Sequence, residues 1–442
     1  MMTATATATA TAELTGRVHA LAAECPPAAL DHAARCVLDH LGCALAGHGL
    51  SYARPHFAAM AALGTDPEAT CADGVRRPAF VAAYLNAASA NALDYDDTLQ
   101  GHPGAPIIAA ALAAAERAGA DVGTLLTAVV AGYEAHWLLS RAGAPSPERA
   151  AHVRGVAAWD AMSAGVAAAV AGGADRDRLD RVVGLAATQS LVPFVGQWYR
   201  RPMPTVKNNH GWVAAAGLLA ADLERAGAGG LTAPLDGPEG FWAMAGSDRW
   251  DWAGVDADGG PAILRAGFKR YPACWRLQQY LTVADALLRD GAGREPTHIE
   301  VSGPAGLRKF AEPHVRGPAD VAFSLPTLVA LLVLGVEPGP AWVADRAVAG
   351  TRAVLGRVEV RLAHERAVAV TFADGHRVVA VVPEDDYARP RDWGLDEEEA
   401  EAKFARLAAP VVGAAAAEGL RAALLDPEPG RPVRSVTEHL WR

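Results

Sequence analysis

The sequence predicts a mainly α-helical protein with an inserted α+β domain. Both ends of the chain are expected to form a large all-α domain, and the middle a smaller domain with a β-sheet. Three observations support this fold class: apolar residues recur at helical spacing from residue 14 to about residue 262, strand-like alternation starts after residue 267, and helical patterning returns at residue 396. A chain of 442 residues is also longer than one compact core usually holds, so we expect two domains.

The first half of the chain has the pattern of packed helices. One expected helix face carries Leu30, Val37, Leu38, Leu41 and Leu45. Similar faces are expected over four further segments: Pro106–Ala118, Gly123–Leu139, Met162–Ala171 and Trp212–Ala226. Alanine dominates these segments, and it both favours the helix and lets helices approach closely.

The α+β region is predicted from alternating apolar residues and turn residues. Four strands are expected, over His298–Ser302, Arg357–Leu362, Ala367–Phe372 and His376–Val382. Asp374 and Gly375 predict a two-residue hairpin turn between the last two strands. Helices are expected between the strands and before them, over Trp275–Arg289 and Ser324–Leu334.

Helical signals return near the C-terminus. Asp396 and Glu399 have the spacing of a capping box, and Glu399 and Lys403 have the spacing of an i,i+4 ion pair. Phe404 and Leu407 should face a core, and Val412–Leu425 is a further alanine-rich helix. The division that follows is a disordered tail (1–12), an all-α helical domain (13–265), an α+β domain (266–393) and C-terminal helices that return to the helical domain (394–442).

Composition excludes several classes of protein. A net charge of −10 and a pI near 5.8 argue against a nucleic-acid partner, which requires a basic face. The sequence contains no run of about 18 apolar residues, so no membrane span is predicted. The Thr-Ala alternation of residues 1–12 has neither the basic region nor the apolar core of a signal peptide. Five cysteines without a CxxC pair favour a reducing cytoplasm over a disulfide scaffold or a zinc site.

The stretch from Asn91 to Pro106 concentrates side chains that can do chemistry. Within nine positions it holds five of them: Asp94, Asp96, Asp97, Thr98 and His102. Glycines and prolines follow, so the cluster is expected on a loop or a frayed helix end. Carboxylates and a histidine in such a place can serve an active site, a metal or a helix cap.

One interpretation of this stretch is a phosphatase. Asp94-Tyr95-Asp96-Asp97-Thr98 matches the DxDxT pattern of haloacid-dehalogenase-type phosphatases, in which the first Asp is the nucleophile and carboxylates hold Mg²⁺. That motif needs a buried strand directly before it, whereas residues 87–93 read as helix. A Mg²⁺-dependent phosphatase is therefore the least favoured interpretation.

Two cationic stretches are candidates for the rest of a binding site. Thr205–Gly211 contains Lys207 and precedes an expected helix, and Phe268–Arg276 contains Lys269 and lies where the helical region gives way to the α+β region. Domain junctions are favoured places for ligand clefts, and cations there can bind carboxylates. Taken singly, each Lys or Arg is more readily explained as a solvated surface residue.

Together, these segments resemble the MmgE/PrpD family, which includes 2-methylcitrate dehydratase and cis-aconitate decarboxylase. The matches occur in order over nearly the whole chain, from about Leu14 to Pro410. They are Ala92–Thr98 with His102-Pro103 and Ala105-Pro106, then Ala128–Glu134, Val206-Lys207 with His210-Gly211, Phe268–Cys274, Ala322–Pro326 and Lys403-Phe404.

The resemblance implies a fold and a site. It implies that the α+β domain is a lid, that the protein is a homodimer, and that a cofactor-free and metal-free site for citrate-like or aconitate-like acids lies between helical domain and lid. Positions that the family uses in its pocket are occupied by Asp94, Thr98, His102, Lys207 and Lys269.

Roles follow from the chemistry of these side chains. His102 can carry a proton near neutral pH. Asp94 can orient that imidazole or raise its pKa, and Thr98 can donate to a substrate oxygen. We expect His102, Asp94 and Lys207 to be catalytic. Substrate binding is expected of five residues: Thr98, Lys269, Arg154, Gln278 and Tyr271.

The sequence departs from the family pattern at three positions. Arg154 stands nearest an expected His, Gln278 replaces a second His, and Thr327 replaces a Tyr. An arginine there adds a permanent cation that cannot act as a base at neutral pH. The altered pocket predicts a substrate other than citrate or aconitate, such as an acid of specialised metabolism.

The leading hypothesis is a cytoplasmic, cofactor-independent lyase or isomerase that acts on a small carboxylate-bearing molecule. The alternative is a non-catalytic relative that keeps an acid-binding pocket without turnover.

Overall fold

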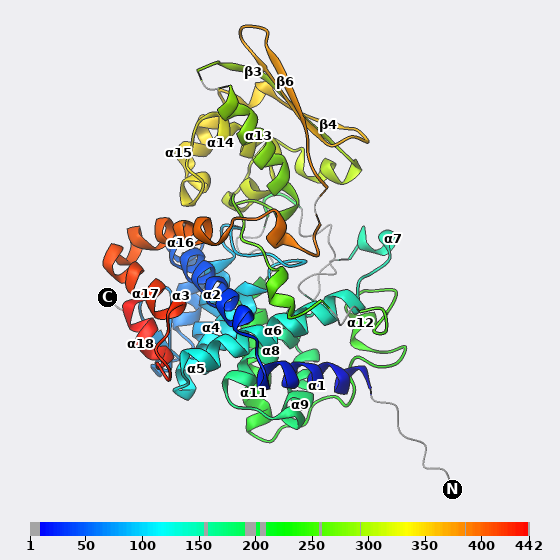
Figure 1. The fold of residues 1–442 in the computed structure, drawn as a ribbon, viewed down its shortest axis with the longest axis vertical. Coiled ribbons are helices and arrows are strands. Elements are labelled where there is room, and N and C mark those ends of the chain that lie inside the picture. Colours follow the sequence, from blue (N-terminus) through cyan, green and yellow to red (C-terminus); the bar gives the residue numbers. More distant parts are fainter. Residues whose placement is uncertain are drawn as a thin grey trace.

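The computed structural model describes residues 9–153, 158–190, 200–203, 209–255, 259–291, 293–384 and 386–440. The protein is mainly α-helical with a small β-sheet, which confirms the predicted fold class. In Figure 1 the helices of both chain ends lie together at the bottom, and the sheet with three helices lies above them.

The lower region consists mostly of alanine-rich helices. From the N-terminal side they are α1 (Ala10–Ala23), α2 (Pro27–His48), α3 (Arg54–Ala61), α4 (Ala79–Ala90), α5 (Gly104–Ala118), α6 (Val122–Ala142), α7 (Pro147–Ala150), α8 (Asp160–Ala171), α9 (Arg176–Ala187), α11 (His210–Arg225) and α12 (Phe241–Met244). Helix α8 packs against α5, α6 and α11. Small residues make this packing close: a Cβ on Gly217 of α11 would lie 2.6 Å from the main-chain nitrogen of Gly165 in α8.

Two details of this region differ from the sequence prediction. Helix α1 begins at Ala10, so the tail predicted over residues 1–12 ends too late. The side chain of Thr9 caps the helix, and the Asp236 carboxylate accepts from the Ala10 main-chain N–H at 2.7 Å. A short antiparallel hairpin, β1 (Ala69–Thr70) and β2 (Arg76–Arg77), was also not predicted, because two-residue strands are too short to show alternation.

The upper region holds a four-stranded sheet in the order β4-β3-β5-β6. Its strands are β3 (Pro296–Gly303), β4 (Val358–Leu362), β5 (Ala367–Phe372) and β6 (Arg377–Val381). The β3–β4 pair is parallel and the other two pairs are antiparallel. Three helices accompany the sheet: α13 (Gln278–Asp290), α14 (Leu325–Val333) and α15 (Asp345–Thr351).

The turn between β5 and β6 has three residues instead of the two predicted. The Phe372 main-chain N–H donates to the carbonyl of His376 at 2.9 Å, and Gly375 adopts φ 82°. A left-handed glycine at the third loop position is what a three-residue hairpin requires.

The chain returns to the helical region through α16 (Glu397–Val412), α17 (Ala414–Leu425) and α18 (Val433–Thr437). Helices α16 and α17 pack against α2, although they lie at opposite ends of the sequence (Figure 1). The capping box of Asp396 and Glu399 is confirmed. The predicted Glu399–Lys403 pair is wrong: Glu399 binds Arg270, and Lys403 is fully buried against Asp39.

Apolar side chains form two main cores. One lies among the helices of the lower region and includes residues of α16, α17 and α18, whereas the other lies between the sheet and α13 and α14. These cores are compatible with the domain boundaries expected at residues 265 and 393, which stay a prediction.

Helix α6 is the one described helix that is long and apolar enough to cross a membrane. Of its most apolar stretch, 83% is buried inside the protein. It packs against α8, α1, α5 and α2, which accounts for its apolar surface without a membrane.

Candidate active site

The predicted stretch forms a loop between α4 and α5. Helix α4 ends at Ala90, and the backbone then adopts left-handed conformations at Asp94 (φ 54°) and Gln100 (φ 50°). Such conformations cost a non-glycine residue about 1–3 kcal/mol and persist only where the surroundings enforce them. The loop that carries the acidic residues is therefore held in a strained shape.

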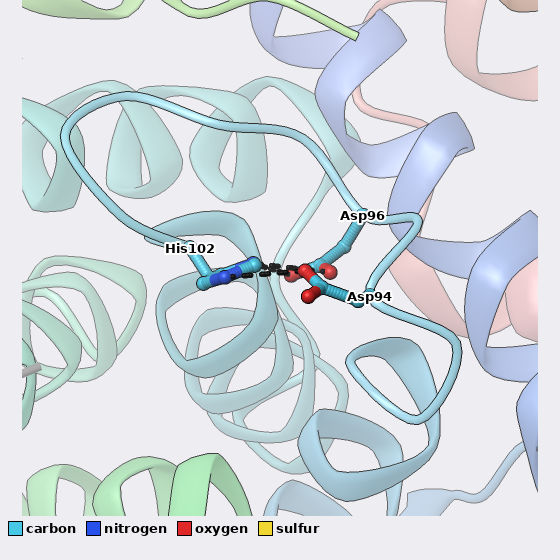
Figure 2. A group of neighbouring side chains, drawn as sticks. All are labelled: Asp94, Asp96 and His102. Carbon is cyan, nitrogen blue, oxygen red and sulfur yellow. Dashed lines mark hydrogen bonds and ion pairs between the residues drawn. The ribbon is translucent and has the colours of Figure 1, made fainter. Parts of the chain in front are cut away.

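His102 faces two carboxylates inside this loop. Its Nε2 lies 3.3 Å from Oδ1 of Asp94, and its Nδ1 lies 3.3 Å from Oδ2 of Asp96. Figure 2 shows the imidazole pointing across the loop at both carboxylates. The Asn91 amide donates to Asp96 at 2.9 Å and lies 3.1 Å from the His102 Nδ1. All four side chains are buried, so water screens these interactions little.

A buried lysine completes the cluster. The Lys269 Nζ donates to the carboxylate of Asp94 at 2.6 Å and to the carbonyl of the same residue at 2.9 Å, and it lies 3.4 Å from the Nδ1 of His102. Burial alone would lower the pKa of Lys269, but Asp94 and Asp96 outweigh it and raise that pKa above its ordinary value. The ammonium therefore stays charged inside the protein.

The same environment keeps His102 neutral. Burial, and then the Lys269 charge, lower the pKa of His102 below its ordinary value, although Asp96 and Asp94 oppose the shift. Asp94 therefore raises the pKa of His102, as expected, but burial and the Lys269 charge together outweigh it. For Asp96, burial would raise the pKa, but His102 and Lys269 lower it well below the usual range. The cluster thus pairs one fixed cation with carboxylates and a neutral imidazole.

Thr98 has a local role in the structure. Its hydroxyl donates to the Gly101 carbonyl at 2.8 Å, and its main chain exchanges hydrogen bonds with Gly267 at 2.9 and 3.0 Å. These bonds tie the loop to the segment that leads into the sheet region. The hydroxyl proton is therefore engaged, and the expected donation from Thr98 to substrate would require it to leave Gly101.

A second buried histidine, His136, lies next to the loop and is paired with Asp160. The Nδ1 of His136 lies 2.8 Å from Asp160, and its Nε2 lies 2.8 Å from the Leu99 carbonyl. Both ring nitrogens face acceptors, an arrangement that favours the doubly protonated imidazolium. Burial would lower the pKa of His136, but Asp160 and the Leu99 carbonyl raise it. His136 thus fixes the far end of the loop through a charged hydrogen bond.

Asp160 connects this pair to His210. The Asp160 Oδ2 lies 4.0 Å from the Nδ1 of His210, the first residue of α11, and the His210 ring lies 5.7 Å from the ring of His102. The preceding residue, Asn209, is left-handed at φ 56°. Two buried imidazoles therefore lie next to each other with their rings tilted by 58°, each beside at least one carboxylate.

Asp97 is a helix cap instead of a member of the cluster. Its Oδ1 accepts from the Gly104 N–H at the start of α5 at 3.2 Å, and its Oδ2 accepts from the Tyr133 hydroxyl. A Cβ on Gly104 would lie 2.3 Å from the Asp97 Oδ1, so a glycine is required there. Burial, with Asp39 and Asp96 nearby, raises the pKa of Asp97 to about 7 despite the Tyr133 hydrogen bond.

Asp97→Asn is expected to make stability less dependent on pH. An unfolded aspartate titrates near about 3.9, whereas the pKa of the folded Asp97 is about 7. Between these values the folded protein binds more protons, so its free energy of unfolding falls as pH rises. From pH 4 to pH 7.5, the free energy of unfolding should fall by about 3–4 kcal/mol less in the variant than in wild type. Urea unfolding at the two pH values measures this difference. Parallel pH curves for the two proteins would contradict this assignment.

Other predicted site residues lie elsewhere. The Tyr271 hydroxyl donates to Asp285 at 2.8 Å, and its ring stacks on Trp342 in the sheet-region core. The Gln278 amide bonds four main-chain groups of Arg270, Tyr271 and Ala273 at 2.9–3.1 Å. Both side chains thus shape the segment after Lys269, and a direct contact with substrate stays a prediction.

Of the remaining predicted positions, the structure describes Thr327 but neither Lys207 nor Arg154. The Thr327 hydroxyl, where the family pattern has Tyr, donates to the Pro313 carbonyl at 3.2 Å. Lys207 and Arg154 lie outside the residues that the structure describes. The described cluster therefore contains Asp94, His102 and Lys269 of the expected site, with Thr98 beside it.

The atoms of Asp94, Asp96 and His102 are close enough to one another to hold a cation. However, the Lys269 ammonium already lies 2.6 Å from Asp94 and 4.0 Å from Asp96, and a divalent ion would have to approach this fixed charge. The DxDxT motif also follows a helix and a turn instead of a buried strand. Both observations weigh against the phosphatase interpretation.

Sequence reasoning left several residues off the list of expected site residues. His136, Asp160 and His210 were not assigned a role in the site, and Asp96 was considered only for the phosphatase. A signal did exist for His136 and Asp160, because each is an ionisable residue within or at the start of an apolar helix. Such residues are rarely buried without a partner.

Comparison with protein-family models shows which family the chain resembles. A family model described as the MmgE/PrpD N-terminal domain matches residues 12–253. This is more than half of the 442-residue chain, and it includes the loop with His102 as well as His136, Asp160 and His210. Lys269 and the sheet region lie beyond it. No curated protein matches the chain.

Proposed function

The chain belongs to the MmgE/PrpD family, and we propose that it is a cofactor-independent lyase or isomerase acting on a small carboxylate-bearing molecule. The family includes dehydratases and other lyases that act on carboxylates. The observation that carries the proposal is the buried cluster in which neutral His102 lies beside Asp94, Asp96 and the charged Lys269.

The cluster suits the removal of a proton next to a carboxylate. Loss of water or carbon dioxide from such an acid builds negative charge on the substrate, and a fixed buried cation stabilises that charge. Lys269 directs two of its three N–H donors to Asp94, and the third, 3.4 Å from the Nδ1 of His102, is the one we propose to turn to a substrate oxygen. Lys207 and Arg154 are proposed to hold further substrate carboxylates.

His102 is proposed to move the proton. A base must be unprotonated at the working pH, and the lowered pKa of His102 supports this at neutral pH. The Asp94 carboxylate beside the His102 Nε2 favours one ring orientation. No step in this scheme requires chemistry that the side chains themselves do not supply.

Elimination of water needs a second proton transfer, to the leaving hydroxyl. We propose His210 for that step, because its ring lies 5.7 Å from that of His102 and Asp160 lies 4.0 Å from its Nδ1. A substrate bound beside the two imidazoles would have one group to take a proton and one to give it. The altered family positions support a non-standard substrate, and the expected homodimer and cytoplasmic location stay predictions.

His210→Asn is expected to lower kcat by about 100-fold, because it removes one of the two proton carriers. KM should change little, since the proposed substrate cations are untouched. Steady-state kinetics with thermal unfolding as a check on folding would measure both. A kcat equal to that of wild type would remove His210 from the mechanism.

The proposed function is tested with a panel of hydroxy- and unsaturated di- and tricarboxylates. Incubation should convert at least one of them, with a gain or loss of alkene absorbance and a mass change matching water or carbon dioxide, or with isomerisation at constant mass. Thermal stabilisation by a panel member without any product would instead support the non-catalytic, acid-binding alternative. Phosphate release in a separate phosphatase assay with Mg²⁺ would instead support the phosphatase interpretation.

A further inference from the structure

Three carbonyls of the loop between α4 and α5 accept hydrogen bonds from buried cationic side chains. Lys269 donates to the Asp94 carbonyl at 2.9 Å, and His136 holds the Leu99 carbonyl at 2.8 Å. The third is the Tyr95 carbonyl, which accepts from the Nζ of Lys403 at 2.5 Å. Lys403 comes from α16, 308 residues further along the chain, and is absent from the mechanism above.

Lys403 is fully buried and charged. Its Nζ lies 2.7 Å from the carboxylate of Asp39 in α2 and 4.0 Å from the centre of the Tyr95 ring. Burial would lower the pKa of Lys403, but Asp39 outweighs this and raises it. A buried ion pair rarely improves stability over apolar residues of the same volume, so stability alone gives no reason for it.

The position of the hydrogen bond from Lys403 to the Tyr95 carbonyl does give a reason for the buried charge. Tyr95 stands between Asp94 and Asp96, the two carboxylates that flank His102. Asp94 has a left-handed backbone, a conformation that relaxes unless its neighbours are held. The ring end of Tyr95 is fixed separately, because its hydroxyl donates to the Arg270 carbonyl at 3.0 Å. Lys403 acts on the main chain of Tyr95, where the direction of both carboxylates is set.

We propose that Lys403, neutralised by Asp39, is a positioning residue that holds Asp94 and Asp96 against His102. It acts through the Tyr95 carbonyl, because its ammonium is held between that carbonyl and the carboxylate of Asp39. This inference rests on the proposed function for its effect on kcat, and on geometry alone for its effect on the loop.

The test is the double variant Asp39→Asn/Lys403→Met, which removes both charges and leaves no buried ion unpaired. We expect kcat to fall by about 10- to 100-fold with KM nearly unchanged, since small misplacements of catalytic groups have effects of this size. Hydrogen exchange of the amides of residues 94–98 should become faster, while that of α5 and α6 stays as in wild type. Asp39→Asn/Lys403→Gln restores a neutral donor toward Tyr95 and should recover part of both effects.

A matched control separates positioning from general stability. Arg117→Met/Asp222→Asn removes a two-point ion pair between α5 and α11, with bonds of 2.5 and 2.9 Å, away from the loop. It should lower the melting temperature without changing kcat or the exchange of residues 94–98. If the Asp39/Lys403 variants fold and show wild-type kcat and wild-type exchange, the inference is overturned. If the loop exchanges faster but His102→Asn leaves turnover unchanged, the positioning role holds and the proposed function fails.

Discussion

His102→Asn is expected to lower kcat by about 10²–10⁴-fold, the usual contribution of a positioned general acid or base. Asparagine can still hydrogen bond near Asp94 and Asp96, so the melting temperature should change little. The assay is steady-state turnover of whichever panel acid wild type converts. Turnover equal to that of wild type in the folded variant would remove His102 as the proton carrier.

The pH dependence of kcat/KM is a second measurement of the role of His102 as proton carrier. Because burial and Lys269 lower the pKa of His102, wild-type kcat/KM should hold its neutral-pH value down to below pH 6.5 and fall only at more acid pH. The acid limb belongs to protonation of this base, so it should be absent from the residual activity of His102→Asn. An unchanged acid limb would assign it to another group.

Lys269→Met is expected to abolish measurable turnover and to destabilise the protein by about 3–5 kcal/mol, the usual cost of removing one partner of a buried ion pair. The loss follows because Asp94 and Asp96 would remain buried without their 2.6 Å and 4.0 Å neighbour. Urea unfolding measures the first effect and the panel assay the second.

Asp94→Asn/Lys269→Met separates these two effects. It removes the uncompensated carboxylate along with the ammonium, so most of the lost stability should return, whereas activity should not. Recovery of turnover in the double variant would show that Lys269 serves folding only. A stability of Lys269→Met equal to that of wild type would contradict the charged state assigned to this lysine.

Local patterns were sufficient to predict most of the fold. The segments expected to be helical at Pro106–Ala118 and Gly123–Leu139 lie within α5 and α6, and the strand expected at Ala367–Phe372 is β5. Each of these is an element whose apolar spacing and propensity act over neighbouring residues. The hairpin of β1 and β2 escaped because two-residue strands carry no period.

The site depends on contacts that local patterns do not contain. Glu399 and Lys403 have ideal helical spacing, yet burial sends Lys403 to Asp39, which is distant in sequence. For His136 the decisive partners are Asp160 and the Leu99 carbonyl, which only the packed helices bring together. The loop itself was found because five polar side chains within nine residues, followed by glycine and proline, break a helical pattern visibly.

The measurement that tests the central claim most directly is hydrogen exchange into the substrate. A panel acid that wild type converts is incubated in D₂O, and deuterium at carbon is followed by mass spectrometry in recovered substrate and product. Proton transfer by His102 beside Asp94 and Lys269 should give enzyme-dependent deuterium at one carbon. That signal should be lost in His102→Asn and retained in Arg117→Met/Asp222→Asn. Deuterium incorporation at the wild-type rate in His102→Asn would contradict the account.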